Sequence, residues 1–152
     1  SQVVVSGTED GVAAACDRVE TDLGARWVRL YVGGAFHSPL MAPAGRRLGA
    51  ALRRAGFAAG HAPVVANVDA RPHGDGDDWP RLMETQLTAP VRWEECVRTL
   101  TGKMGCGRFL ELGPGRTLAG LVTRVDARVP VVSAGTPEAL AAVAADTADV
   151  TP

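Results

Sequence analysis

The chain has 152 residues, of which 16 are basic and 17 acidic, and its net charge is −1. A hydrophobic fraction of 46% with a charged fraction of 22% is typical of a folded globular protein and excludes extensive disorder. The balanced charge excludes a broadly basic surface, so we expect neither nucleic acid nor an anionic membrane as a partner, and no run approaches the about 20 apolar residues that cross a bilayer.

The cysteines and the first residues indicate the cellular compartment of the protein and whether the sequence continues upstream. Cys16, Cys96 and Cys106 are an odd number without CxxC spacing, which disfavours a disulfide framework and a zinc site. Reduced thiols fit a cytoplasmic protein. The first residues also lack the basic segment followed by an apolar segment that is typical of a signal peptide. Residue 1 is not Met, and the apolar run 3–5 follows almost at once, so we expect a further segment upstream.

The beginning of the chain predicts a strand, a helix and a second strand. Residues 2–6 are an apolar strand candidate. Thr8 is a suitable N-cap for a helix over 9–22, where apolar residues recur at helical spacing, and Gly24 ends that helix. Residues 26–32 alternate as a second strand, so the three elements have the size of one βαβ unit.

A Gly-Gly pair at 33–34 breaks the second strand, and another helix follows. Ser38 followed by proline is an N-cap with proline in the first helical position, which predicts a helix over 39–56. Residues 62–68 form an apolar strand of the kind buried on both faces. The polar, Gly- and Asp-rich residues 69–78 predict a loop.

The rest of the chain alternates between helices and strands. Residues 79–87 predict a helix, and a new helix restarts at 88–90. The later elements are a strand at 108–112, a tight turn at 113–115, a helix at 116–124, a strand at 129–133 and a helix at 136–146. The tail 149–152 is expected to fray. Such alternation is typical of an α/β fold with a mostly parallel sheet and helices on its faces.

His37 is the most informative polar residue. It lies between a Gly-Gly pair and a helix N-terminus, at the carboxyl end of a predicted strand, where α/β folds bind ligands. A neutral imidazole there can act as a general base, although position alone favours a histidine that merely caps or packs against the turn. The adjacent Ser38 diverges from it and already has a capping role. Because GxSxG is absent, no nucleophile for His37 is visible.

The stretch from Gln86 to Trp93, QLTAPVRW, contains a helix end followed by a proline at the start of the next helix. The carbonyl of a residue at a helix C-terminus has no helical partner. The Gln86 carbonyl could therefore orient an imidazole, which on spacing alone is a hypothesis.

Three other groups of residues have simpler explanations. Cys106 could be a reactive thiol, but a buried structural cysteine is favoured. Residues 111–118 resemble a phosphate-binding loop in outline, yet they match neither GxGxxG nor GxxxxGK[ST], so a sharp turn at a sheet edge is favoured. A metal cluster could be drawn from five side chains, but their spacing matches no recognised site and a solvated loop is favoured. These five are His61, His73, Asp75, Asp77 and Asp78.

Four segments together resemble one family. Residues 33–41, GGAFHSPLM, resemble the GAFHSPLM signature of malonyl-CoA:acyl-carrier-protein transacylases, which recurs in polyketide-synthase acyltransferases. Residues 86–93, QLTAPVRW, resemble the family's QLxxPVRW stretch. Residues 111–121 resemble its ExGPGxxLxGL segment, and 63–68, PVVANV, resemble its PVVSNV strand. The four occur in the family's order and spacing.

The resemblance implies transfer of a malonyl group from coenzyme A to the phosphopantetheine thiol of an acyl carrier protein, through an acyl-serine, in fatty-acid or polyketide synthesis. His37 matches the family's catalytic histidine, and Gln86 matches the residue whose backbone carbonyl holds the other ring nitrogen, where triads use Asp. Phe36 resembles the choice of malonyl-selecting relatives, because a bulky ring crowds an α-methyl branch. No cofactor is implied, since coenzyme A and carrier-bound phosphopantetheine are substrates.

The resemblance also implies what these residues lack. The family's GHSxG serine, its GQG loop and the arginine that pairs with the malonyl carboxylate all precede the region that matches residue 1. We therefore expect the C-terminal half of a transacylase. Residues 1–32 would be the second half of a ferredoxin-like small subdomain, and 33–152 part of a larger α/β-hydrolase-like subdomain. Without the serine and the oxyanion hole, the chain alone is expected to be inactive.

Two other functions stay open on the sequence. A half-domain with exposed sheet edges could be a non-catalytic scaffold or a docking module for carrier proteins, and replacing His37 would then leave binding intact. A different hydrolase could use Cys106, and blocking that thiol would then abolish its activity.

Overall fold

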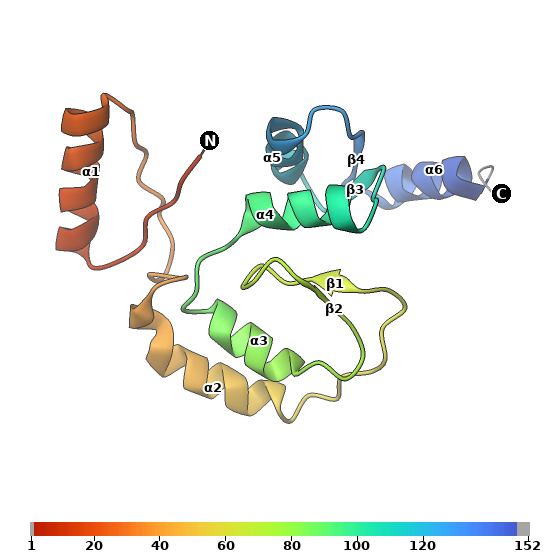
Figure 1. Cartoon of the computed structure of the whole chain (residues 1–152), viewed down its shortest axis with the longest axis horizontal. Helices are drawn as coiled ribbons and strands as arrows, with labels where there is room; N and C mark the ends of the chain where they lie inside the picture. Colours follow the sequence, from red (N-terminus) through yellow and green to blue (C-terminus); the bar gives the residue numbers. More distant parts are fainter. Residues whose placement is uncertain (1, 149–152) are drawn as a thin grey trace. The chain divides into compact units, whose positions relative to one another are not determined.

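A computed structural model describes residues 2–148, so the fraying predicted for 149–152 lies outside the described residues. The chain divides into two compact units, unit 1 (residues 1–92) and unit 2 (residues 93–152) (Figure 1). The boundary expected after residue 32 comes from the family resemblance and stays a prediction. Within the described part of the chain, no helix combines the length and the apolar character needed to span a membrane.

Helix α1 (Glu9–Leu23) forms as predicted in unit 1, because both of its ends are capped. The Thr8 side chain accepts a hydrogen bond from the amide of Gly11 at 3.2 Å. Gly24 closes the helix in the left-handed region, at φ 56°, where a side chain would be strained. The predicted apolar face is only half-buried and consists of Val12, Ala15, Cys16 and Val19.

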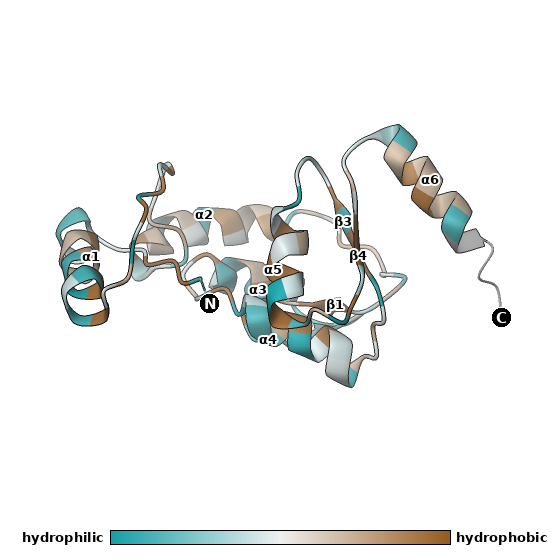
Figure 2. Cartoon of the chain, turned by 90° about the horizontal axis from the view of Figure 1, so that it is seen from above, coloured by the Kyte–Doolittle hydropathy of each residue, from teal (hydrophilic) through white to brown (hydrophobic). Residues whose placement is uncertain are grey.

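The two strands predicted on either side of α1 do not form, and these two predictions are wrong. Residues 2–6 and 26–32 are chain without strand pairing, seen as brown stretches beside α1 in Figure 2. Their large apolar side chains are exposed, from 47% at Trp27 to 92% at Tyr31. A strand requires hydrogen bonds to a neighbouring strand, and no segment of residues 2–148 supplies them here. The apolar pattern alone therefore does not produce a sheet.

The second predicted helix is present but shorter. A 3-10 turn (Pro39–Met41) leads into α2 (Ala42–Leu52), which ends four residues before the predicted end at residue 56. The chain tightens after Leu52, where Arg54 and Ala55 donate to carbonyls three residues earlier at 3.1 Å, as is common in a last helical turn. Helix α3 (Trp79–Gln86) begins after Asp78, whose side chain accepts from the Arg81 amide at 3.1 Å.

Helices α2 and α3 lie side by side in unit 1, and two glycines of α2 allow their close approach (Figure 1). Gly45 and Gly49 are one helical turn apart and are both buried. A methyl group on Gly49 would overlap the carboxylate of Glu84 on α3. Arg53 Nη1 lies 3.2 Å from Glu84 Oε2, so the same carboxylate also links the C-terminal end of α2 to α3.

A short hairpin separates the two helices in sequence. Strand β1 (Val64–Val65) pairs antiparallel with β2 (Pro72–His73). The predicted strand over 62–68 is therefore reduced to two residues, and the predicted loop over 69–78 contains its partner. The chain reverses at Ala70, which has φ 57° and donates to the carbonyl of Ala66 at 2.8 Å.

Unit 2 begins with α4 (Trp93–Arg98), which continues into a π-helical turn (Thr99–Lys103). The helix starts later than the predicted restart at 88–90. Proline disfavours the helical conformation in the preceding residue, Ala89, and the amide of Arg92 instead donates to the carbonyl of Asn67 at 2.9 Å.

The remainder of unit 2 is a strand, helix, strand and helix in the predicted order. Strands β3 (Phe109–Leu112) and β4 (Val131–Ala134) pair in parallel and are joined by α5 (Thr117–Val125), and α6 (Pro137–Ala148) follows. A parallel pair with a helical crossover is the α/β arrangement that the alternation predicted. Among the described residues of unit 2, the buried apolar ones come from α4, α5 and β4, and they are Cys96, Val97, Ala119, Val122 and Ala134.

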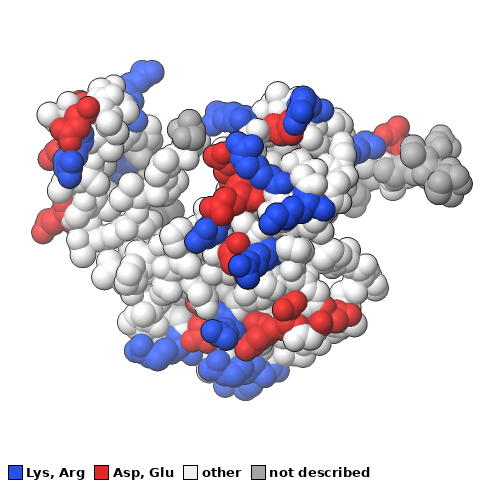
Figure 3. Space-filling view, in the orientation of Figure 1, with Lys and Arg blue, Asp and Glu red and all other residues white. Residues whose placement is uncertain are grey.

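Charged side chains of both signs are interspersed on the face shown in Figure 3. Along the chain, charged side chains also pair one helical turn apart, such as Arg98 with Glu94 at 2.8 Å and Arg18 with Asp22 at 3.2 Å. This face therefore carries no single-sign field, in keeping with the net charge of −1.

Candidate functional site

The backbone of His37 is held in an uncommon conformation by the turn that follows α3. His37 has φ 64°, in the left-handed region that few residues other than glycine adopt. Its amide donates to the carbonyl of Leu87 at 3.0 Å. A left-handed conformation costs a non-glycine residue about 1–2 kcal/mol, so the surrounding contacts must stabilise it. The result is a histidine projected from a fixed point just before the turn Pro39–Met41.

The ring of His37 has two backbone carbonyls at one nitrogen. Nδ1 lies 3.0 Å from the oxygen of Gln86 and 3.2 Å from the oxygen of Ala89. Carbonyl oxygens only accept, so this pair assigns the ring proton to Nδ1. The lone pair of the neutral imidazole is then on Nε2, and the residue is exposed. A histidine in this tautomer can accept a proton from a substrate or a nucleophile at Nε2.

The sequence explains why the Gln86 carbonyl is available. Helix α3 ends at Gln86, and in a continuing helix its carbonyl would accept from the amide of residue 90. Residue 90 is proline, which has no N–H. The Ala89 carbonyl is a second acceptor that sequence reasoning missed. The proline that ends α3 is the signal that could have suggested a free carbonyl on either side of this turn.

Ser38 is a capping residue, as predicted. Its Oγ donates to the carbonyl of Ala35 at 2.7 Å and accepts from the amide of Leu40 at 3.3 Å, and only 4% of the residue is exposed. Its hydroxyl is therefore fully occupied within its own turn. Among residues 2–148, no serine side chain forms a hydrogen bond with the His37 ring.

Phe36 lies beside Met41 near the same turn. A methyl group on Gly34 would come within 3.3 Å of the Met41 sulfur and 3.6 Å of the Phe36 ring. The two side chains thus flank Gly34, and Phe36 keeps 43% of its surface exposed. An aromatic ring and a thioether therefore both approach Gly34, in the segment that leads into the turn Pro39–Met41.

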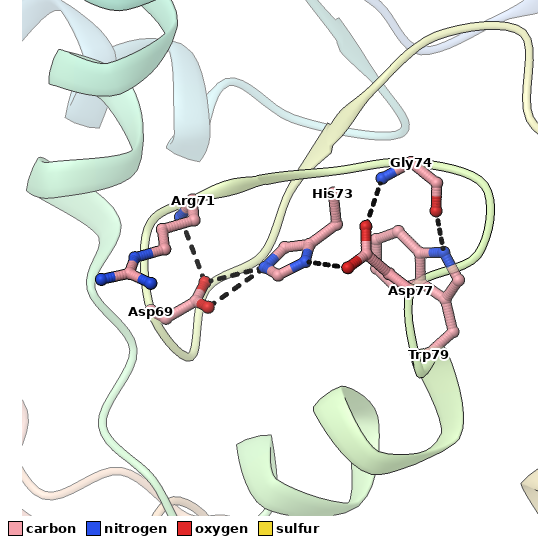
Figure 4. Close-up of polar contacts among 6 residues, drawn as sticks. All are labelled: Asp69, Arg71, His73, Gly74, Asp77 and Trp79. Atoms are coloured by element: carbon pink, nitrogen blue, oxygen red, sulfur yellow. Dashed lines mark hydrogen bonds and ion pairs between the residues drawn. The ribbon is translucent and has the colours of Figure 1, made fainter.

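A second polar cluster was not expected from the sequence. His73 Nε2 lies 3.1 Å from Asp69 Oδ2, and His73 Nδ1 lies 3.4 Å from Asp77 Oδ1 (Figure 4). Asp77 also accepts from the Gly74 amide at 2.8 Å, while Trp79 Nε1 donates to the Gly74 carbonyl at 3.3 Å. The His73 side chain is only 13% exposed, so the prediction of a solvated loop is wrong at this residue. Aspartates four residues before and after a histidine were the overlooked signal.

The two carboxylates stabilise the imidazolium form of His73. Burial lowers the pKa of His73, but the hydrogen bonds and charges of Asp69 and Asp77 outweigh it and raise the pKa above its ordinary value. For Asp69, burial raises the pKa, but the Arg71 amide and His73 outweigh it and lower the pKa below its usual range. The cluster therefore ties β2 to the start of α3 through charge-assisted hydrogen bonds.

We expect the loop around His73 to be most protected near pH 5 to 6. Because the folded pKa of His73 is raised, its stabilising contribution is complete below the unfolded value of about 6.5 and is lost as pH rises through the folded value. Because the folded pKa of Asp69 is lowered, its contribution is lost as pH falls through that value. Hydrogen-exchange protection factors of the Arg71 and Gly74 amides should therefore fall both above and below this pH range. Protection independent of pH would contradict this assignment.

The other residues from which a metal cluster could be drawn, an interpretation that the sequence disfavoured, have separate roles. Asp75 accepts from the Gly60 amide at 2.7 Å, Asp78 caps α3, and His61 is exposed. Across the described part of the chain, no group of three or more histidine, cysteine, aspartate or glutamate side chains is placed to hold a metal ion. Cys106 is half-buried rather than buried, and it and Cys16 are free thiols.

The turn between β3 and α5 is the sharp turn that the sequence favoured. Gly113 and Gly115 have φ of 127° and 92°, values that glycine adopts freely. The first amides of α5 are occupied by Glu111, whose two carboxylate oxygens accept from Leu118 at 2.9 Å and Ala119 at 3.1 Å. A carboxylate of the chain itself thus fills the position that a phosphate would take at this helix N-terminus.

Comparisons with known proteins decide the family. No protein-family model matches the chain. The malonyl CoA-acyl carrier protein transacylase of Bacillus subtilis (strain 168) is 35% identical over 139 residues, which cover 91% of this chain and 44% of that protein. The chain is a homologue of the malonyl CoA-acyl carrier protein transacylases. The family inferred from the four motifs is therefore confirmed.

Solved transacylases have the same fold as this homologue. The acyl-carrier-protein-S-malonyltransferase of Bartonella henselae matches with a TM-score of 0.84 and 31% identity, over 93% of this chain and 45% of that one. A malonyl-transacylase solved in complex with its type II PKS acyl-carrier protein matches with a TM-score of 0.84 and 31% identity, over 92% of this chain and 45% of that one. The α/β acyltransferase fold is thus shown, and the chain spans less than half the length of these relatives.

Proposed function

We propose that residues 1–152 are the C-terminal part of an acyl-carrier-protein S-malonyltransferase and supply its catalytic histidine. The full-length protein would move a malonyl group from coenzyme A to the phosphopantetheine thiol of an acyl carrier protein, with no further cofactor. The observation that carries the proposal is the His37 ring, whose Nδ1 lies 3.0 Å from the Gln86 carbonyl in a homologue of malonyl transacylases. The proposed division into a ferredoxin-like part, 1–32, and an α/β-hydrolase-like part, 33–152, rests on the same resemblance.

In the first half-reaction, His37 acts as a general base. Nε2 takes the proton of a serine hydroxyl that lies outside these residues, since the sequence contains no GxSxG. The serine oxygen forms a bond to the malonyl carbonyl carbon, and the carbon–sulfur bond of the thioester breaks. The imidazolium returns its proton to the departing coenzyme A sulfur. The two carbonyls at Nδ1 stabilise the imidazolium in between, as a carboxylate does in a Ser-His-Asp triad.

The second half-reaction uses the same groups in reverse. His37 takes the proton of the phosphopantetheine thiol, the sulfur attacks the malonyl-serine, and the serine oxygen regains its proton. Phe36, which is 43% exposed beside Met41, is proposed to limit the acyl group. Its ring would leave room for the unsubstituted malonyl carbon but crowd an α-methyl branch, a difference of one methyl group that a pocket discriminates by about 1–3 kcal/mol.

The proposal is tested by incubating the full-length polypeptide that carries these residues with malonyl-CoA and a phosphopantetheinylated carrier protein. We expect the carrier to gain one malonyl group, and we expect none when residues 1–152 are used alone. A full-length protein that binds the carrier but never loads it would favour the docking-module alternative and contradict the proposal.

A further inference from the structure

The side chain of Gln86 lies inside the turn that faces His37. Its Nε2 is 3.2 Å from the carbonyl oxygen of Ala89 and 3.4 Å from that of Pro90. The same nitrogen is 3.3 Å from His37 Nδ1. The family resemblance assigns a role only to the backbone carbonyl of Gln86, and the proposed mechanism does not use its side chain.

The two carbonyls fix the orientation of the Gln86 amide. Turning it over would place its oxygen against the oxygens of Ala89 and Pro90, which cannot donate. In the observed orientation, Oε1 is buried and has no hydrogen-bond partner among residues 2–148. A buried acceptor without a partner is unfavourable, so the two donor contacts of Nε2 must compensate for it. The side chain is thus committed to the turn rather than to solvent.

The proton on His37 Nδ1 decides what the amide does. An Nδ1–H and an amide N–H are both donors, so they do not bond to each other. Nδ1–H therefore points to the oxygens of Gln86 and Ala89, and the amide donates to Ala89 and Pro90 instead. The Ala89 oxygen has two lone pairs and accepts from the ring and from the amide at once. The Gln86 amide therefore holds the Ala89 oxygen in place, and that oxygen in turn orients the His37 ring.

We propose that the Gln86 side-chain amide is a positioning group for His37, which holds the Ala89 and Pro90 carbonyls so that the ring keeps its proton on Nδ1 and its lone pair on Nε2. This inference depends on the proposed function only in assigning the oriented ring a role in catalysis. The placement of the ring proton can be tested without any activity.

The test is the tautomer of His37, measured on the whole 152-residue chain by the nitrogen chemical shifts of ¹⁵N-labelled histidine at a pH where the ring is neutral. Gln86→Met keeps the length of the side chain and removes its donors. We expect the wild-type ring to be mainly Nδ1–H and the fraction of this tautomer to fall at least about twofold in Gln86→Met, because one of its two acceptors is no longer held. Thr88→Ala is the matched control. It removes a hydrogen bond to Thr85 O at 3.3 Å in the same turn without touching either acceptor, and it should leave the tautomer unchanged.

A second variant covers a loss of folding. If Gln86→Met unfolds by circular dichroism, Gln86→Leu is used, because it also lacks the amide donors and, unlike a carboxylate, offers Nδ1–H no new acceptor, and the same loss of Nδ1–H is expected. An Nδ1–H fraction equal to wild type in a folded Gln86 variant would overturn the inference and leave the proposed function untouched. If the tautomer changes as expected but the wild-type full-length protein transfers no malonyl group, only the proposed function is overturned.

Discussion

If the proposed function is correct, replacing His37 by alanine in the full-length protein is expected to lower kcat by about 10²- to 10⁴-fold, the usual contribution of a general acid–base residue. The loss arises because no group would take the serine proton at Nε2 or return it to the departing sulfur. His37 makes its own contacts through Nδ1 and its backbone amide, so Nε2 is the part of the ring left for the substrate side. The measurement is the initial rate of malonyl transfer to the carrier protein at saturating malonyl-CoA.

The control for this variant is His61→Ala. His61 is also an exposed histidine of unit 1, but it lies outside the turn around α3, so its removal should leave kcat within about twofold of wild type. Equal rates for His37→Ala and the wild-type protein would show that His37 is a packing residue, which is the interpretation that position alone favoured.

Replacing Glu111 by alanine is expected to have the largest effect on the stability of unit 2 and to lower its midpoint of thermal unfolding by about 5–10 °C. The carboxylate accepts three hydrogen bonds, from the Leu118 and Ala119 amides and from Ser133 Oγ at 3.0 Å. It thereby joins β3 to the start of α5 and to β4. Removing it leaves the first amides of α5 and the Ser133 hydroxyl without this acceptor.

The pH dependence of unfolding gives a second signature of Glu111. Burial raises its pKa, but the two amides, Ser133 and the nearby Arg116 outweigh burial and lower the pKa below its ordinary value. A group with a lowered folded pKa stabilises the protein above its unfolded pKa and loses that effect as pH falls through the folded value. The stability difference between wild type and Glu111→Ala should therefore shrink in acid.

Asp146→Ala is the matched control for Glu111. Asp146 is also an acidic residue of unit 2, but its pair with Arg108 at 3.0 Å is on the surface, with 68% of the aspartate side chain exposed. Exposed pairs contribute little, so its loss should shift unfolding by less than about 2 °C. Similar shifts for the two variants would mean that Glu111 is only a surface charge.

Local signals explain which elements the sequence predicted well. Thr8 and Gly24 mark the ends of α1 within the helix's own sequence, and the glycine turn after Leu112 marks the start of α5. Helix caps depend on residues a few positions apart, so a single sequence carries them. Strand 62–68 shrank to Val64–Val65 because its length depends on a partner more distant in the chain.

Some residues of the candidate site were likewise predictable from the sequence and others were not. His37 and the Gln86 carbonyl were linked through motifs 49 residues apart, which spacing alone could only suggest and the family resemblance made specific. The Ala89 carbonyl and the Gln86 side chain were missed, because a turn's carbonyl directions follow from its dihedral angles rather than from residue type. The His73 cluster was missed because its glycines and aspartates are also the composition of a solvated loop.

The most direct test of the central claim is the intact mass of the protein before and after a short incubation with malonyl-CoA. The account predicts that the full-length polypeptide gains the mass of one malonyl group, held as an ester on a serine outside residues 1–152. Residues 1–152 alone should gain nothing, although they carry His37 in its Nδ1–H form. A malonyl ester on this chain alone, or none on the full-length protein, would contradict the account.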